Sequence, residues 1–81
     1  MAATKDDLRR WFQYGQESSS HMIILCDMLD WSDHPVYVES RERAAEYLAG
    51  NGLPNGYKVM EVYDLAMDME AQMAEHRAWH I

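Results

Sequence analysis

The chain has 81 residues, of which 14 are acidic and 7 are basic, giving a net charge of −7. This length predicts a single compact domain over residues 1–81, and a hydrophobic content of 48% excludes a fully disordered chain. The charge makes nucleic acid a poor partner, because binding to its backbone requires clustered Lys and Arg.

The cysteine count and the hydropathy of the chain indicate its cellular compartment. One cysteine excludes an internal disulfide bond, and the N-terminal MAATKDDLRR lacks the apolar run of a signal peptide. The longest apolar run, residues 22–26, is too short to cross a bilayer. We therefore expect a cytoplasmic protein without a membrane partner.

Residues 5–15 predict an amphipathic helix, which Thr4 can cap. Its apolar positions recur at i, i+3, i+4 and i+7, so that one face carries Leu8, Trp11, Phe12 and Gly15. Gly15 is a plausible end of this helix. Residues 21–28 (HMIILCDM) predict a central strand covered on both faces, because five consecutive residues are apolar.

Residues 35–39 (PVYVE) predict a second strand, which the short link LDWSDH joins to the first in an antiparallel hairpin. Pro35 suits the start of a strand, where its missing N–H costs least. Ser40 can cap a helix over about residues 41–49, and the sequence Gly-Asn-Gly at 50–52 ends it.

Residues 57–65 predict a third strand and residues 68–78 a last helix. Strict alternation would place Val59 and Tyr63 on one face of that strand and Met60 and Val62 on the other. The whole pattern predicts an α+β fold of order αββαβα, a two-layer sandwich with a three-stranded, mostly antiparallel sheet. The expected core consists of Ile24, Leu25, Val36, Val38, Val59 and Val62.

Several groups resemble catalytic or metal sites only superficially. Asp27, Asp30 and Asp33 recur every three residues, but they lack the Gly and the distal Glu of a calcium loop and are typical of turns. The four histidines have no zinc spacing. Cys26 lies within an apolar strand, where a thiol is inert. We therefore expect no enzyme, no metal and no cofactor.

Aromatic and basic residues are the better candidates for binding. Trp31 has charged neighbours and should lie at least partly at a surface, as an interface anchor or a stacking platform, unless it folds back over a sheet edge. Arg41 and Arg43 begin a helix, where the dipole disfavours cations, although pairing with nearby Glu side chains is the simpler explanation. The predicted ligand or partner contacts are Trp31, Asp33, His34, Tyr37, Tyr63, His76, Arg77, Arg41 and Arg43.

Two blocks, HMIILCDMLDWSDHPVYV and KVMEVYDLAMDMEAQMAEHRAWH, together with the first helix, give the chain a family likeness. It resembles a family of small uncharacterised proteins of phages, prophages and bacteria. The shared elements are Cys26-Asp27, Asp33 with Pro35-Val36-Tyr37-Val38, Val59 to Leu65, and His76-Arg77. The resemblance implies a phage-like context, and with it the host cytoplasm, but it carries over no catalytic residue and implies no chemistry.

By analogy with small acidic phage proteins, we expect a counter-defence factor that acts by binding. The first hypothesis is sequestration of a small nucleotide-like immune signal in a homo-oligomer, because the chain carries both stacking and anion-binding groups. The second is direct inhibition of a host defence or nucleic-acid-binding protein by an acidic surface. The third is an accessory phage protein. The small size of the domain also favours a homo-oligomer, a dimer or larger.

Overall fold

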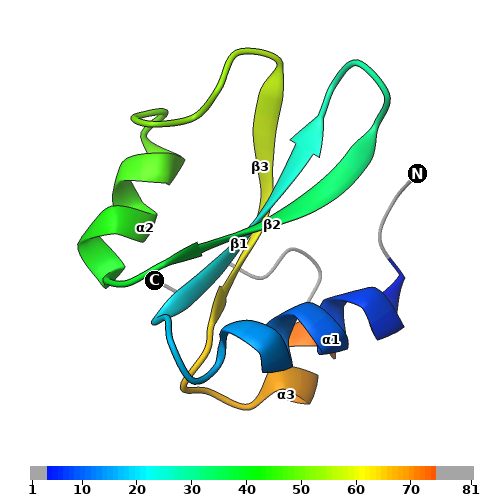
Figure 1. Ribbon diagram of the computed structural model, residues 1–81, viewed down its shortest axis with the longest axis vertical. Helices are drawn as coiled ribbons and strands as arrows, with labels where there is room; N and C mark the ends of the chain where they lie inside the picture. Colours follow the sequence, from blue (N-terminus) through cyan, green and yellow to red (C-terminus); the bar gives the residue numbers. More distant parts are fainter. Residues whose placement is uncertain (1–3, 75–81) are drawn as a thin grey trace.

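The computed structural model describes residues 4–74, which form a three-stranded antiparallel sheet and three helices (Figure 1). The predicted α+β class and the order αββαβα are confirmed. In chain order the elements are α1 (Lys5–Gly15), β1 (His21–Asp27), β2 (Ser32–Val38), α2 (Arg41–Leu48), β3 (Tyr57–Asp64) and α3 (Met69–Ala74). The sheet order is β2-β1-β3, so β2 and β3 are the outer strands of the sheet.

Side chains of the central strand β1 point alternately into two cores, one on each face of the sheet. The first core joins β1 and β3 to α1 through Phe12, Met22, Ile24, Tyr63 and Leu65. The second joins the sheet to α2 through Ile23, Leu25, Val38, Ala44 and Val62. The predicted coverage of β1 on both faces is confirmed, and α2 adds a third layer to the expected two-layer sandwich.

Figure 1 shows α1 and α3 side by side, with α2 apart from them. Arg9 of α1 joins the two by an ion pair with Glu70 of α3, in which Nη2 and Oε1 are 3.0 Å apart. This contact lowers the pKa of the Glu70 carboxyl. The predicted last helix continues to residue 78, and the part beyond residue 74 lies outside the described residues.

A β-bulge changes the alternation of side chains along β3. The register against β1 shifts by one residue, and Met60 is the extra residue. Val59 and Val62 consequently belong to the core under α2, whereas Met60 and Tyr63 belong to the core under α1. The prediction that Val59 and Tyr63 share one face of β3, and Met60 and Val62 the other, is wrong, because strict alternation ends at a bulge.

Four of the six predicted core residues are buried, namely Ile24, Leu25, Val38 and Val62. The other two, Val36 and Val59, are half-buried and pack against the core under α2.

Both predicted caps are present. The Thr4 hydroxyl accepts a hydrogen bond from the Asp7 backbone N–H, and the Asp7 carboxylate accepts one from the Thr4 N–H, which together make a capping box. These bonds to Thr4 are the main cause of a lowered Asp7 pKa. The Ser40 hydroxyl likewise accepts from the Arg43 N–H at the start of α2.

Gly15 ends α1 as predicted, but packing explains the glycine. A Cβ at this position would lie 2.4 Å from ring carbons of Tyr37. The Tyr37 hydroxyl donates to the Trp11 carbonyl oxygen at 2.7 Å, which holds the ring across the end of α1. Within the described chain, no helix is long and apolar enough to span a bilayer.

Candidate functional site

The structure distributes the predicted contact residues over two places at opposite ends of β2. Tyr37 and Arg43 line a groove near the end of this strand. Trp31, Asp33 and His34 lie where the strand begins, at the β1–β2 turn. His76 and Arg77 lie outside the described residues, so their predicted contacts stay predictions.

Two predicted residues belong to neither place. Arg41 is exposed at the start of α2 and does not line the groove. Tyr63 lies in the core under α1 with 1% of its surface exposed, and its hydroxyl donates to Glu61 Oε2 at 2.7 Å. Burial is the main cause of its strongly raised pKa. Tyr63 therefore packs the core and is not available to stack on a ligand, which corrects the predicted site.

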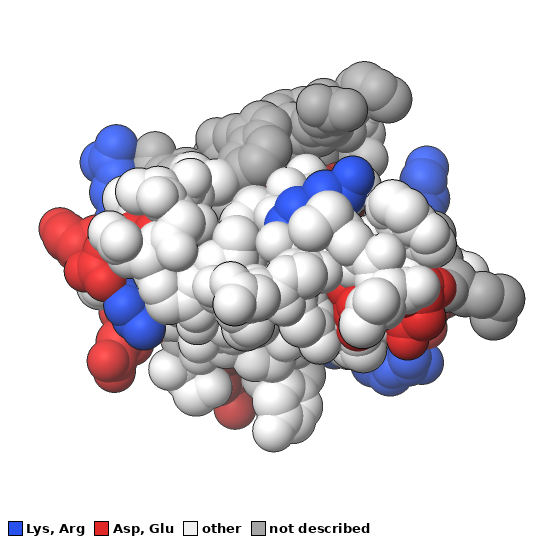
Figure 2. Space-filling model, turned by 90° about the horizontal axis from the view of Figure 1, so that it is seen from above, with Lys and Arg blue, Asp and Glu red and all other residues white. Residues whose placement is uncertain are grey.

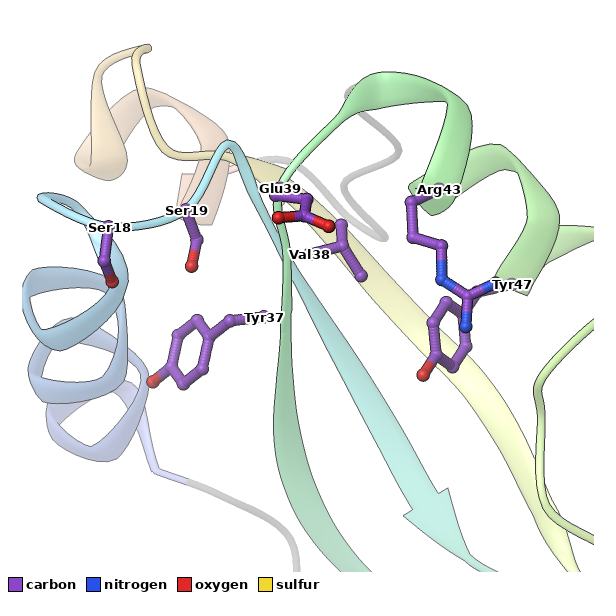
Figure 3. A pocket seen from close by; sticks show the side chains of 7 residues that line it. All are labelled: Ser18, Ser19, Tyr37, Val38, Glu39, Arg43 and Tyr47. Carbon is purple, nitrogen blue, oxygen red and sulfur yellow. The ribbon is translucent and has the colours of Figure 1, made fainter.

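The groove has a volume of about 400 Å³ and is open to one side (Figure 3). Its walls come from the α1–β1 connection, the end of β2 and one face of α2. The lining residues are Ser18, Ser19, Tyr37, Val38, Glu39, Arg43 and Tyr47. Figure 3 shows Tyr37 and the two serines on one side, Arg43 and Tyr47 on the other, and Glu39 between them.

Arg43 is held in place before any ligand arrives. Its Nη1 donates to Glu46 Oε2 at 2.6 Å, and its Cζ lies 5.3 Å from the centre of the Tyr47 ring. The predicted pairing of this arginine with a nearby glutamate is thus present. An ion pair at one nitrogen leaves further guanidinium donors, since the group carries five N–H bonds.

Tyr37 offers the groove an aromatic ring. Its hydroxyl is engaged with Trp11, and burial, with a smaller effect of the neighbouring Tyr14, raises its pKa. The Tyr14 and Tyr37 rings are 5.6 Å apart, centre to centre. The ring of Tyr37 is therefore fixed on two sides and can serve as a wall for a planar ligand.

At the other end of β2, residues 28–31 form a tight connection that we call the hairpin turn. Its apolar side chains are exposed, Met28 by 42%, Leu29 by 90% and Trp31 by 59%. The predicted surface position of Trp31 is confirmed. Trp31 has a φ of 61°, and its N–H donates to the Asp27 carbonyl oxygen at 2.7 Å. Lys58 Nζ of β3 lies 5.4 Å from the centre of the Trp31 ring.

The aspartates around the hairpin turn shape its backbone. Asp27 Oδ1 accepts from the Leu29 N–H, and Asp30 Oδ1 accepts from the N–H and the hydroxyl of Ser32. The bonds from Ser32 lower the pKa of Asp30. These are the predicted Asx turns. Among residues 4–74, no three His, Cys, Asp or Glu side chains are grouped as metal ligands would be.

Two further residues, His34 and Cys26, lie close to the hairpin turn. His34 is exposed, with Nε2 at 2.8 Å from the Ser32 hydroxyl, and its ring lies 6.3 Å from that of Tyr57. Cys26 is buried opposite Asp33 in the β1–β2 register, and burial, followed by the charge of Asp33, raises the pKa of its thiol. The expected core position of Cys26 is confirmed.

Comparison of the chain with protein-family models, with curated proteins and with solved structures finds no match. Sequence reasoning missed several residues of the site, namely Ser18, Ser19, Glu39 and Tyr47 in the groove and Met28, Leu29 and Lys58 at the hairpin turn. Only Leu29 had a visible signal, because it is the one large apolar residue besides Trp31 in the link LDWSDH.

Proposed function

We propose that this chain is a non-enzymatic binding protein that sequesters a small, nucleotide-like anion in the groove between α2 and the α1–β1 connection. The observation that carries the proposal is the placement of Arg43, two tyrosine rings and two serine hydroxyls around one groove of about 400 Å³. That volume falls within the roughly 300–1,000 Å³ that is usual for small-molecule sites.

The charges of the groove favour a ligand with both acceptor and donor groups. A guanidinium suits phosphate or carboxylate oxygens, to which it can donate two parallel hydrogen bonds. Glu39 lines the same groove and would repel a simple anion, but it can accept from the N–H groups of a nucleobase. A nucleotide carries both kinds of group, together with a ring that can stack on tyrosine.

The acidic net charge of the chain opposes binding of an anion only at long range. Salt screens such interactions beyond about 8 Å under physiological conditions, so the local pair of Arg43 and ligand dominates within the groove. Glu46 is the direct competitor, because it already holds Arg43. The pair is exposed to solvent, and exposed pairs exchange partners at little cost.

The proposal includes a homo-oligomer, in which a second copy would close the open side of the groove. It is supported by the small size of the domain. Light scattering on the purified protein should give a molar mass of at least two chains. The counter-defence role and the host cytoplasm are supported by the sequence resemblance to phage proteins.

The experiment that tests the function is a thermal-shift screen with linear and cyclic nucleotides. A bound nucleotide should raise Tm, and heating the complex should release it chemically unchanged. Arg43→Ala should weaken its binding about tenfold or more, the equivalent of about 1.4 kcal/mol. Arg41→Ala is the matched control, since Arg41 begins the same helix outside the groove, and it should bind like the wild type.

Three results would contradict the proposal. If no nucleotide shifts Tm, the groove is not a nucleotide site. Equal weakening by Arg43→Ala and Arg41→Ala would indicate a general charge effect. A chemically altered nucleotide after release would indicate an enzyme.

A further inference from the structure

The hairpin turn exposes an unusual amount of apolar surface for so short a segment. Three of its four residues are large and apolar, and Leu29 is the most exposed large hydrophobic side chain of the described chain. Single exposed apolar residues are ordinary on protein surfaces, whereas adjacent ones mark contact sites. Figure 1 shows this turn at the far end of the β1–β2 ribbon, away from all three helices.

The backbone at Trp31 is strained, and the fold does not offset that strain by burying the side chain. A φ of 61° lies in the left-handed region, which glycine adopts readily and bulky residues rarely do. More than half of the Trp31 side chain is exposed, so core packing cannot be the reason for a tryptophan here. Strain of this kind concentrates at functional sites, and a surface tryptophan is a preferred anchor of protein interfaces.

The margin of the turn is acidic. Asp27 precedes the exposed side chains in the sequence, Asp30 lies between Leu29 and Trp31, and Asp33 is the second residue of β2. Lys58 is the cation placed over the Trp31 ring. Figure 2 views the molecule from the end that carries the hairpin turn and shows mostly uncharged atoms over the described part of this face, with a basic side chain near its centre and charged side chains of both signs towards its margins.

We propose that the hairpin turn is a docking element, which inserts Leu29 and Trp31 into an apolar pocket bordered by Lys and Arg on a partner protein. Charge complementarity selects this occupant, because the acidic margin of the turn and the net charge of −7 both attract a basic rim. The same charges disfavour a second copy, which carries the same three aspartates in and beside its turn. Anionic lipid surfaces and nucleic acid are disfavoured for the same reason.

The docking element is distinct from the nucleotide groove, since the two lie at opposite ends of β2. It gives the second hypothesis, direct inhibition of a host protein, a specific surface. A single chain could carry both activities, and variants at one site should leave the other unchanged.

The test uses a disulfide-cyclised random peptide library displayed on phage and panned on the full-length protein without any depletion step. Cyclic peptides can enclose a protruding side chain, and selection favours the surface with the best anchors. We expect most selected peptides to combine apolar residues with Lys or Arg. Their affinity should fall about tenfold or more with Trp31→Gly and with Leu29→Ser, and it should also fall when salt is raised.

Two controls separate docking from folding and from general stickiness. Trp31→Gly should have a Tm equal to or higher than the wild type, because glycine relieves the positive φ. Met67→Ser removes another half-exposed apolar side chain, one that lies between β3 and α3, and should leave peptide binding unchanged. Arg43→Ala should also leave it unchanged, which distinguishes a failure here from a failure of the nucleotide proposal.

The proposal is overturned if the selected peptides bind Trp31→Gly as well as the wild type, or if no peptide binds. Selected peptides that require Trp31 but lack basic residues would overturn the proposal that the partner's pocket has a basic rim. If light scattering shows that wild-type protein associates and Trp31→Gly is monomeric, the occupant is a second copy and the proposal is wrong. Binding of the wild type, but not of Trp31→Gly, to anionic vesicles would identify a lipid surface instead.

Discussion

Replacing Ile24 by alanine is expected to lower the free energy of unfolding by about 2–5 kcal/mol. Ile24 is 1% exposed at the centre of the middle strand, in the core under α1. The substitution removes buried methyl and methylene groups and leaves a cavity that the close-packed neighbours fill only in part. A domain of this size has a total stability of about 5–10 kcal/mol, so the loss is a large share of it.

Urea denaturation at constant m-value measures this loss. Leu29→Ala is the matched control, because leucine is an isomer of isoleucine and Leu29 is 90% exposed. It should change the free energy of unfolding by no more than about 0.5 kcal/mol. Ile24→Val, a smaller truncation, should fall between them at about 0.5–1.5 kcal/mol. A loss well under 1 kcal/mol for Ile24→Ala would show that β1 is not buried on both faces.

The features that could be predicted from the sequence are those set by local interactions. A helix cap joins a side chain to a backbone N–H three residues away, so Thr4 and Ser40 can be identified from their immediate neighbours. The central position of β1 follows from its uninterrupted apolar run, since such a strand needs cover on both faces.

Features that depend on distant segments could not be predicted in this way. The extra residue Met60 is visible only in the register of β3 against β1, and it reverses the faces of the residues before it. Tyr63 has the same local pattern as a tyrosine on an open sheet face, and α1 decides its burial through contact of Phe12 with its ring.

The candidate site was predictable to a similar extent. Charged neighbours predict that Trp31 reaches a surface, and it does. The left-handed backbone of Trp31 could not be expected, because most residues at such a position are Gly or Asn. The groove brings Ser18 and Tyr47 together from separate elements, and no spacing in the sequence records this proximity.

The second large effect concerns Gln72, a buried polar side chain that joins α3 to the end of β3. Gln72 is 1% exposed. Its Oε1 accepts from the Asp64 N–H at 2.8 Å, and its Nε2 donates to the carbonyl oxygens of Asp64 and Asp68 at 2.9 and 3.2 Å. In the described chain, no buried side-chain nitrogen or oxygen lacks a hydrogen-bond partner, and these bonds satisfy both polar atoms of Gln72.

Gln72→Leu keeps most of the volume and removes all three side-chain bonds. The carbonyl oxygens of Asp64 and Asp68 still accept from the backbone N–H groups of Met67 and of residue 72, so the Asp64 N–H is the group that loses its partner. We expect a loss of about 1–3 kcal/mol, the cost of leaving one such donor unsatisfied. The loss should be concentrated at the α3 end of the molecule, where amide hydrogen exchange at Asp64 should become faster. Gln13→Leu is the control, because Gln13 is exposed on α1 and should change stability by about 0.5 kcal/mol or less.

Gln72→Glu distinguishes the contribution of the bonds that Gln72 donates from that of the bond that it accepts. Its carboxylate can still accept from the Asp64 N–H, but it cannot donate to the two carbonyl oxygens, and burial close to Asp64 and Asp68 disfavours its charge. Burial therefore raises the pKa of the introduced carboxyl, whose protonated form donates again. The stability that this form contributes is fully present below the ordinary carboxyl pKa and is lost as pH rises through the raised value. The difference in stability from the wild type should consequently shrink as pH falls from about 7 to about 4. A difference that stays constant over this range would show that the donated bonds do not hold α3 to β3.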